Sequence, residues 1–349
     1  MEPLRVGLVG YGGAGRGIHA RLLREAGHTV TAVVTRSRAE QVRADWPAAQ
    51  VVPDVDGLLG LAATLDLVVI ASPTGEHVAH TEAVLQAGVP VVVDKPVATD
   101  AAGAQRVVDA ATRTGGRLTV FHNRRWDDEQ RALRRLLADG ALGAVHRFER
   151  RWERFRPEPL HRWKEQDTVG GGLLLDLGAH LVDSAVELFG PVERVYAEVR
   201  ALTTPAADDV FLALVHEPLG DAPAVVSHLQ AGGLVGAPGP RTRVLGSDGA
   251  YLVTEYEGEP TPFSALDDAY EETRRAGEPR HQGWLVRGGE RTPVPAPRGD
   301  EHVGFYRQVV GWLRDGAPPP VDPVDAVRTA RVLDAALRSA REGEVVRLR

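Results

Sequence analysis

The segment VGLVGYGGAG, residues 6–15, decides the fold class of this chain. It joins a short apolar run to a turn with glycine at positions 10, 12 and 15, and a helical pattern follows at residues 18–26. Gly10 and Gly12 permit a tight turn and a close approach of a pyrophosphate to bare backbone, whereas Gly15 permits close packing of helix on strand. Amide groups at the start of the helix would bind the phosphates. The segment therefore predicts the first strand, turn and helix of a dinucleotide-binding Rossmann domain.

The first 120 residues continue this alternation, and the remainder of the chain changes pattern. Strand-like runs are followed in turn by helical stretches. The predicted strands are residues 5–10, 30–35, 67–71, 89–93 and 118–121, and the predicted helices are 18–26, 75–87 and 101–114. Apolar runs such as LVVIA fit a parallel sheet that is covered on both faces. Later runs alternate in the manner of antiparallel strands, and we expect the Gly- and Pro-rich residues 257–300 to form a surface excursion.

These patterns predict two domains, which also suits a chain of 349 residues. Residues 1–122 are expected to form an α/β Rossmann domain with a parallel sheet. Residues 123–349 are expected to form an α+β domain with a mostly antiparallel, open-faced sheet that binds substrate and carries the oligomer contacts.

Composition and charge exclude several classes of function. The net charge of −7 provides no electrostatic footprint for a nucleic acid partner. The absence of cysteine excludes disulfides, zinc fingers and thiol catalysis. Residues 6–9 are too short an apolar run for a signal peptide or a membrane span. We therefore expect a cytoplasmic protein with no membrane partner.

The residues after the second predicted strand indicate which nicotinamide dinucleotide is bound. An acidic side chain at this point would accept hydrogen bonds from a free ribose 2′-hydroxyl. The chain instead reads Thr35-Arg36-Ser37-Arg38, and arginine can bind a 2′-phosphate through charge-assisted hydrogen bonds. This turn favours NADP over NAD, although both arginines could instead be solvated surface charges.

Two further segments contain candidate catalytic groups. Lys95 follows an apolar run at the carboxyl end of a predicted parallel strand, which is the edge where open α/β sheets bind ligands. Asp176 and His180 are four residues apart, so on a helix they share one face and the carboxylate could orient the imidazole. Asp183 and Glu187 extend that face, but no second histidine completes a ligand set, and we expect no metal.

These motifs, in this order and spacing, resemble the Gfo/Idh/MocA family, named for glucose-fructose oxidoreductase and inositol dehydrogenase. The resemblance covers nearly the whole chain. It is carried by the glycine turn, Ser72-Pro73-Thr74 with His77, Asp94-Lys95-Pro96, Asn123-Arg124-Arg125-Trp126, and residues 170–180. The family usually has glutamate where this chain has Asp94, which leaves the contacts of that carboxylate open. The two arginine-containing segments are most similar to NADP-preferring members that act on inositols or sugars.

The resemblance implies transfer of a hydride between nicotinamide and a secondary hydroxyl or carbonyl of a sugar, inositol or related polyol. Such a reaction needs a base for the hydroxyl proton. Lys95 and His180 are both candidates for this base, with Asp176 orienting His180. The expected cofactor contacts are Gly10, Gly12, Gly13, Ala14, Gly15, Thr35, Arg36, Ser37, Arg38, Ser72, Pro73, Thr74, His77, Asp94 and Lys95. The expected substrate contacts are Asn123, Arg124, Arg125, Trp126, Arg162 and Trp163.

Two other functions fit the same motifs. One is a glycoside hydrolase that oxidises a sugar transiently with bound nicotinamide, and the other is a non-catalytic sensor of NADP or another ligand. Net reduction of the cofactor would separate a dehydrogenase from both. The resemblance also implies a homodimer or homotetramer.

Overall fold

A computed structural model describes residues 2–218, 220, 223–254, 281–295, 297 and 302–348. Their contacts divide the chain into two units. The first unit extends to Asn123 and includes the later helix α10 (Val303–Arg314); the second begins at Arg124. The sequence predicts a single boundary after residue 122. The chain returns to the first unit because α10 packs on its sheet, where the rings of Phe305 and Phe121 are 4.8 Å apart.

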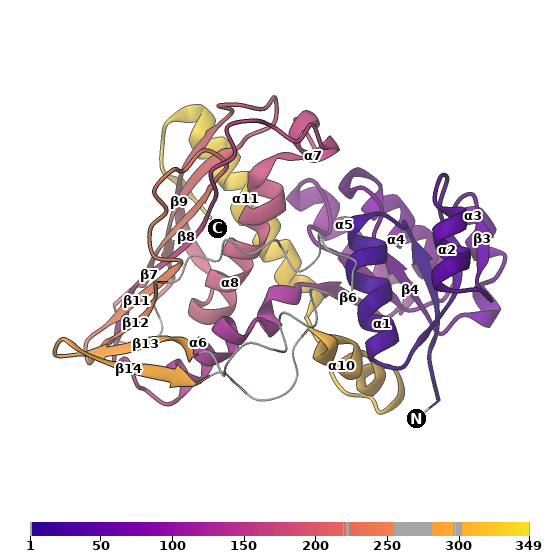
Figure 1. Ribbon diagram of the computed structural model, residues 1–349, viewed down its shortest axis with the longest axis horizontal. Coiled ribbons are helices and arrows are strands. Elements are labelled where there is room, and N and C mark those ends of the chain that lie inside the picture. The colour runs from indigo at the N-terminus through magenta and orange to yellow at the C-terminus, as the bar shows by residue number, and fades with distance from the viewer. Residues whose placement is uncertain are drawn as a thin grey trace. The chain divides into compact units, whose positions relative to one another are not determined.

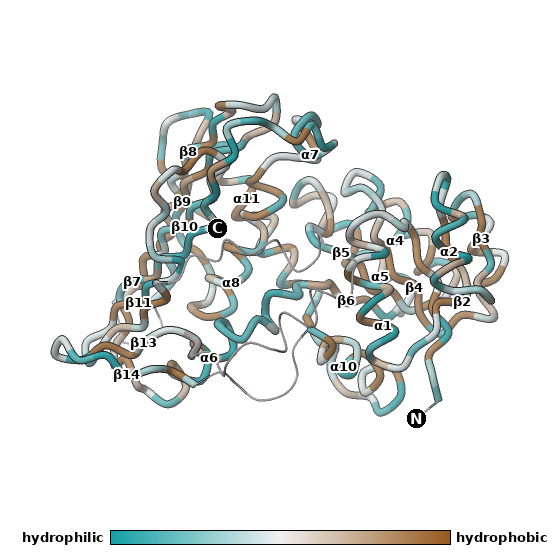
Figure 2. Tube along the Cα trace, in the orientation of Figure 1, coloured by the Kyte–Doolittle hydropathy of each residue, from teal (hydrophilic) through white to brown (hydrophobic). Residues whose placement is uncertain are grey.

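The first unit contains a six-stranded sheet in the order β3-β2-β1-β4-β5-β6, and all of its strand pairs are parallel (Figure 1). The strands are β1 (Arg5–Val9), β2 (Thr29–Val34), β3 (Gln50–Val52), β4 (Leu67–Ile70), β5 (Val91–Asp94) and β6 (Leu118–Phe121). β4, β5 and β6 are buried along their whole length, and the strands of this sheet are mostly hydrophobic in Figure 2. The predicted parallel sheet is confirmed; β3 was not anticipated because it is only three residues long.

Short helices connect these strands. They are η1 (Gly15–Ala20), α1 (Arg21–Glu25), α2 (Ala39–Asp45), α3 (Val55–Leu59), η2 (Ala62–Thr64), η3 (Thr74–Glu76), α4 (His77–Gln86) and α5 (Ala101–Thr114). The first helix differs from the expectation because its opening part, η1, is a π-helix rather than an α-helix. Single π-helical turns frequently occur at functional sites.

The second unit is built on a nine-stranded sheet in the order β14-β13-β12-β11-β7-β10-β9-β8-β15. These strands are β7 (Val145–Glu153), β8 (Val192–Arg200), β9 (Asp209–His216), β10 (Val226–Gly232), β11 (Thr242–Gly246), β12 (Ala250–Val253), β13 (His281–Arg287), β14 (Glu290–Pro295) and β15 (Val346–Arg347). Every pair is antiparallel except β10 with β7. Buried and half-buried residues alternate along β9, as expected for a sheet with one covered face.

The helices of the second unit lie on one face of this sheet in Figure 1, as α8 shows most clearly. They are α6 (Asp128–Ala138), α7 (Trp163–Gln166), η5 (Leu174–Gly178) and α8 (Ala179–Phe189), together with the later part of α11 (Pro323–Glu342). The 3-10 turn η4 (Asn123–Trp126) leads into α6. In the part of the chain that the structure describes, no helix has the length and apolar character needed to cross a membrane.

Residues 257–300 correct one expectation. We expected a surface excursion, but β13 and β14 form a hairpin that extends the sheet by pairing with β12. The glycine and proline content concealed it, since Gly283 lies at an irregularity of the β13–β14 register and has φ +90°. Residues 257–280 lie outside the described part.

Candidate active site

The glycine turn has the geometry that its sequence predicts. Gly10 has φ +93°, and a Cβ there would lie 2.6 Å from the carbonyl oxygen of Ala71. A Cβ on Gly15 would lie 2.1 Å from the carbonyl oxygen of Gly10. A Cβ on Gly12 or Gly13 would meet nothing within 4 Å, so this stretch of backbone borders open space. The turn therefore fits a pyrophosphate, which must approach bare backbone.

Side chains from both ends of the turn hold it against α2. The carboxylate of Asp45 accepts hydrogen bonds from the hydroxyl of Tyr11 at 2.8 Å and from Nε of Arg16 at 2.5 Å. These hydrogen bonds lower the pKa of Asp45, with the guanidinium of Arg16 contributing most. No local motif indicates this contact, because Asp45 is 29 residues from Arg16.

The arginine turn lies at the end of β2. The backbone amide of Arg38 donates to Oγ1 of Thr35 at 3.3 Å, which folds the four residues into a turn. The side chain of Arg36 is 86% exposed and lies 3.7 Å from the carboxylate of Glu76 in η3. Such an exposed ion pair contributes little energy. Arg36 can therefore exchange this partner for another anion.

Three loops meet at the carboxyl edge of the parallel sheet. Val9, Ile70 and Val93 are in register on β1, β4 and β5, so the residues after these strands lie at one edge. The glycine turn follows β1. Ser72, Pro73 and Thr74 follow β4, and Lys95 follows β5.

His77 joins two of these loops. Its ring nitrogens lie 2.7 Å from the carbonyl oxygen of Ser72 and 2.9 Å from that of Pro96. His77 is buried at the start of α4. Its position indicates that it fixes the loop next to Lys95.

The carboxylate of Asp94 is buried below Lys95. It accepts a hydrogen bond from the backbone amide of Lys95 at 2.9 Å and lies 3.7 Å from Nε2 of His19. Burial alone would raise the pKa of Asp94, but His19, Lys95 and His77 outweigh it and lower that pKa. The aspartate that replaces the family's usual glutamate is thus kept ionised beside Lys95.

Sequence reasoning missed the layer behind Asp94. Nδ1 of His19 lies 2.6 Å from the hydroxyl of Tyr306, which is 287 residues away on α10. Both side chains are buried, and burial raises the pKa of Tyr306 well above its usual value. The phenol is therefore neutral and can donate to His19. A contact across this separation has no local sequence signal.

His180 lies in the second unit, at the start of α8. It is buried, and its ring centroid is 6.0 Å from that of Trp152 on β7. The guanidinium of Arg124 lies 4.5 Å from the centroid of the same indole, and that of Arg241 lies 5.3 Å from it. All four side chains line one pocket. Trp152 and Arg241 were not among the predicted site residues, because in the sequence they belong to ordinary strand patterns.

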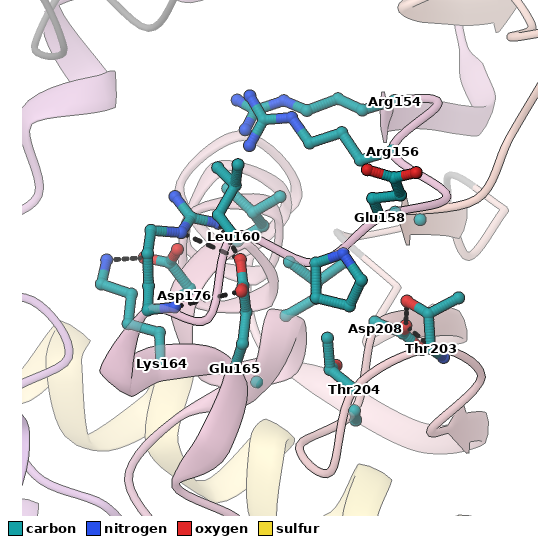
Figure 3. A pocket seen from close by; sticks show the side chains of 18 residues that line it. Arg154, Arg156, Glu158, Leu160, Lys164, Glu165, Asp176, Thr203, Thr204 and Asp208 are labelled. Carbon is teal, nitrogen blue, oxygen red and sulfur yellow. Dashed lines mark hydrogen bonds and ion pairs between the residues drawn. The ribbon is translucent and has the colours of Figure 1, made fainter.

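Asp176 precedes His180 but is not on the same regular helix. It lies in η5, which is π-helical, whereas His180 belongs to α8. Its carboxylate accepts a hydrogen bond from Nζ of Lys164 at 2.6 Å. Asp176 and Lys164 line a second pocket of this unit (Figure 3). The premise of one continuous α-helical face is therefore corrected, although four residues still make about one turn.

The predicted substrate contacts occupy different environments. Arg124 lines the same pocket as His180, as described above. Arg125 donates to both carboxylate oxygens of Asp183, at 3.0 and 2.6 Å, and both side chains are largely buried. Trp126 is buried and Asn123, which ends the first unit, is 4% exposed.

The remaining two predicted contacts flank the start of α7. Arg162 lines the pocket of Asp176 and is bound to Glu165 at 2.7 Å. Trp163 is 45% exposed. Glu187, considered above as a metal ligand, accepts a hydrogen bond from Gln130 and forms an ion pair with Arg134.

Known proteins are similar to this chain over most or all of its length. The scyllo-inositol 2-dehydrogenase (NADP(+)) IolW of Bacillus subtilis is 30% identical, with 100% of this chain and 97% of the relative covered. The D-apiose dehydrogenase of Paraburkholderia graminis is 31% identical over 82% of this chain and 74% of its own length. The solved structure of the oxidoreductase yvaA from Bacillus subtilis superimposes with a TM-score of 0.88 at 30% identity, covering 100% of this chain and 99% of that one.

Two family descriptions match the two parts of the chain. Residues 4–122 match the NAD-binding Rossmann fold of the Gfo/Idh/MocA oxidoreductases, and residues 134–348 match the C-terminal alpha/beta domain of the same family. Together with the glycine turn, Lys95 and the open-faced sheet, these matches establish that the chain belongs to the Gfo/Idh/MocA family of oxidoreductases.

Proposed function

We propose that this chain is an NADP-dependent dehydrogenase that oxidises a secondary hydroxyl of a polyol, sugar or inositol, or reduces the corresponding carbonyl. One observation carries the proposal: the glycine turn and Lys95 lie at the same carboxyl edge of one parallel sheet. Ligands of open α/β sheets bind at that edge. The names of the relatives IolW and D-apiose dehydrogenase support the class of substrate.

The chain's own residues would bind the cofactor as follows. The backbone of residues 10–15 holds the pyrophosphate, Arg36 and Arg38 hold the 2′-phosphate, and the loops after β4 and β5 border the nicotinamide side. The bound dinucleotide supplies the hydride acceptor. NADP rather than NAD is favoured because Arg36 is exposed and its contact with Glu76 is long.

Three residues would handle the substrate proton. Lys95 places an ammonium or amine beside the buried, ionised Asp94, and His180 provides an imidazole in a pocket rich in arginine. Asp176 would hold the imidazole in one orientation. Either Lys95 or His180 takes the hydroxyl proton, because each carries a nitrogen that can accept it.

One assay distinguishes the proposed dehydrogenase from a non-catalytic ligand sensor and from a glycoside hydrolase. Purified protein is mixed with NADP or NAD and with inositols, aldoses and sugar acids in turn, and absorbance at the reduced-nicotinamide band is recorded. We expect sustained reduction with at least one polyol and a preference for NADP. Cofactor binding without net reduction by any of these compounds would instead favour the alternatives.

We also propose a homodimer or homotetramer in which the open face of the nine-stranded sheet meets a second copy. This face carries the rings of Phe211 and His228, whose centroids are 5.7 Å apart, and a row of arginine and glutamate side chains. Light scattering at micromolar concentration measures the mass directly. A stable monomer would contradict the proposal.

A further inference from the structure

The distribution of lysine in this chain is unusual. Of its 41 basic residues, two are lysines, Lys95 and Lys164. All other cationic side chains are arginines, which do not release a proton in proteins and which bind carboxylates through a two-pronged fork. A chain that uses arginine almost everywhere has lysine only at the candidate catalytic position and at one other position.

Lys164 contacts the other main candidate residue. Its Nζ lies 2.6 Å from Oδ1 of Asp176, and Figure 3 shows the two side chains meeting at one side of the pocket. The side chain of Lys164 is 39% exposed and that of Asp176 is 23% exposed, so the pair is accessible from the pocket without being fully solvated. Lys164 lies in α7 and Asp176 in η5, twelve residues apart.

Asp183 of the same unit is bound by an arginine, and its contacts show how an arginine in place of Lys164 would hold Asp176. Arg125 binds both oxygens of Asp183, with Nε at 3.0 Å from one and a terminal nitrogen at 2.6 Å from the other. This fork fixes the carboxylate and covers both of its oxygens. An ammonium is a compact point charge, so Lys164 can engage one oxygen of Asp176 and leave the other for a second donor.

From these observations we propose that Lys164 is a positioning residue for hydride transfer, holding Asp176 by one oxygen so that its carboxylate can orient His180. The proposal rests on the proposed dehydrogenase function. It adds a residue for which neither the motifs nor the comparisons suggest a role. Lys164 acts through Asp176, and its ammonium also stabilises the ionised form of that carboxylate.

Two substitutions distinguish the effect of the positive charge of Lys164 from the effect of the way its side chain contacts Asp176. Lys164→Met removes the cation beside Asp176, which raises the pKa of that carboxyl group and, through it, that of the imidazole it is proposed to orient. We expect the acidic limb of the pH profile of kcat/KM to move up by about one unit, with kcat at pH 7 reduced about tenfold. Lys164→Arg keeps the positive charge, so the acidic limb of the pH profile should stay at the wild-type pH. Its kcat should still fall about tenfold, because the fork covers both oxygens of Asp176.

The matched control is Arg200→Met, which removes the cation of an exposed ion pair with Asp209 elsewhere in the same unit. It should leave the pH profile and kcat unchanged. Affinity for NADP and the melting temperature of each variant are measured alongside, and both should remain near the wild-type values. A Lys164→Met profile identical to the wild type, or full activity in Lys164→Arg, would overturn the proposal.

A second measurement does not depend on turnover. An amine-acetylating reagent can modify Lys95, Lys164 and the amino terminus, and mass spectrometry reports each site separately. In Asp176→Asn the amine of Lys164 is no longer held by a carboxylate, so its rate of acetylation at a fixed pH should shift upward relative to that of the amino terminus. Unchanged acetylation would overturn the ion pair itself. Absence of polyol turnover in the wild type, with the acetylation shift present, would count against the dehydrogenase function instead.

Discussion

The two units hold their candidate functional groups by different means. In the first unit the key positions are set by backbone: Gly10 and Gly15 have no space for a Cβ, and Lys95 follows directly from a buried strand. In the second unit, arginine–carboxylate pairs between distant residues line the pocket that contains His180. Arg241 and Glu129, for instance, are 112 residues apart. Geometry set by backbone can be read from a local motif, whereas geometry set by long-range ion pairs cannot.

The largest effect is expected at the lysine of the first unit. Lys95→Ala should reduce kcat/KM about 10³-fold, because it removes a group that holds or moves the substrate proton. Affinity for NADP should change only a few-fold, since the glycine turn is intact. Steady-state kinetics with fluorescence titration of NADPH measures both quantities. Arg106→Met, which removes an exposed ion-paired cation of the same unit, is the control and should behave as wild type.

The next effect concerns the fork that fixes Asp183 in the second unit. Arg125→Met should lower the free energy of unfolding by about 3 kcal/mol, because it leaves a buried carboxylate without its ion-pair partner. Urea unfolding measures this loss. Asp183→Asn combined with Arg125→Met should recover part of it, since the uncompensated charge is then removed. No recovery would mean that Arg125 stabilises this region by packing alone.

A smaller effect, dependent on pH, is expected at Glu129. Its buried carboxylate lies between Arg241 at 2.6 Å and Arg150 at 3.2 Å. Burial would raise the pKa of Glu129, but the two arginines and Thr242 outweigh it and lower that pKa. The ionised group therefore contributes stability above the unfolded-state pKa of 4.5, and this contribution is lost as pH falls through the lower folded-state pKa.

Glu129→Gln should accordingly cost about 2 kcal/mol of unfolding free energy at pH 7. The difference from wild type should shrink as the pH falls below about 4.5. Urea unfolding at a series of pH values tests the sign. A difference that stays constant over this range would show that Glu129 is not the source of the pH dependence.

The smallest effect is expected at the arginine turn of the first unit. Arg36→Ala should weaken binding of NADP about tenfold and leave NAD binding unchanged, because only NADP carries the 2′-phosphate. Fluorescence titration with both reduced cofactors measures the ratio. Equal weakening for the two cofactors would contradict the assignment of Arg36 to the 2′-phosphate.

The difference between local and long-range contacts explains which features could be predicted from the sequence. The glycine turn, the parallel strands and the antiparallel sheet were predicted because each depends on residues close together in the chain. The contact of His19 with Tyr306 was not, because tertiary packing brings together residues that are 287 positions apart. The hairpin of β13 and β14 was missed because its glycine and proline content concealed it. The π-helical form of η1 and η5 was also missed, since apolar periodicity does not distinguish it from an α-helix.

Lys164 is a different case, because a sequence signal for it existed. Its rarity was visible in the composition, but its meaning depended on the contact with Asp176 that the structure provides. The roles of Lys95, Asp176 and His180 remain predictions, and the substitutions of Lys95 and Lys164 described above test the first two.

The most direct test of the account follows the hydride itself. The protein is incubated with NADP and a polyol substrate that carries deuterium at the carbon to be oxidised, and the mass of the NADPH formed is measured. The account predicts NADPH that is heavier by one deuterium and accumulates with the oxidised product. Product formation without labelled NADPH in solution would contradict a dehydrogenase that releases its reduced cofactor.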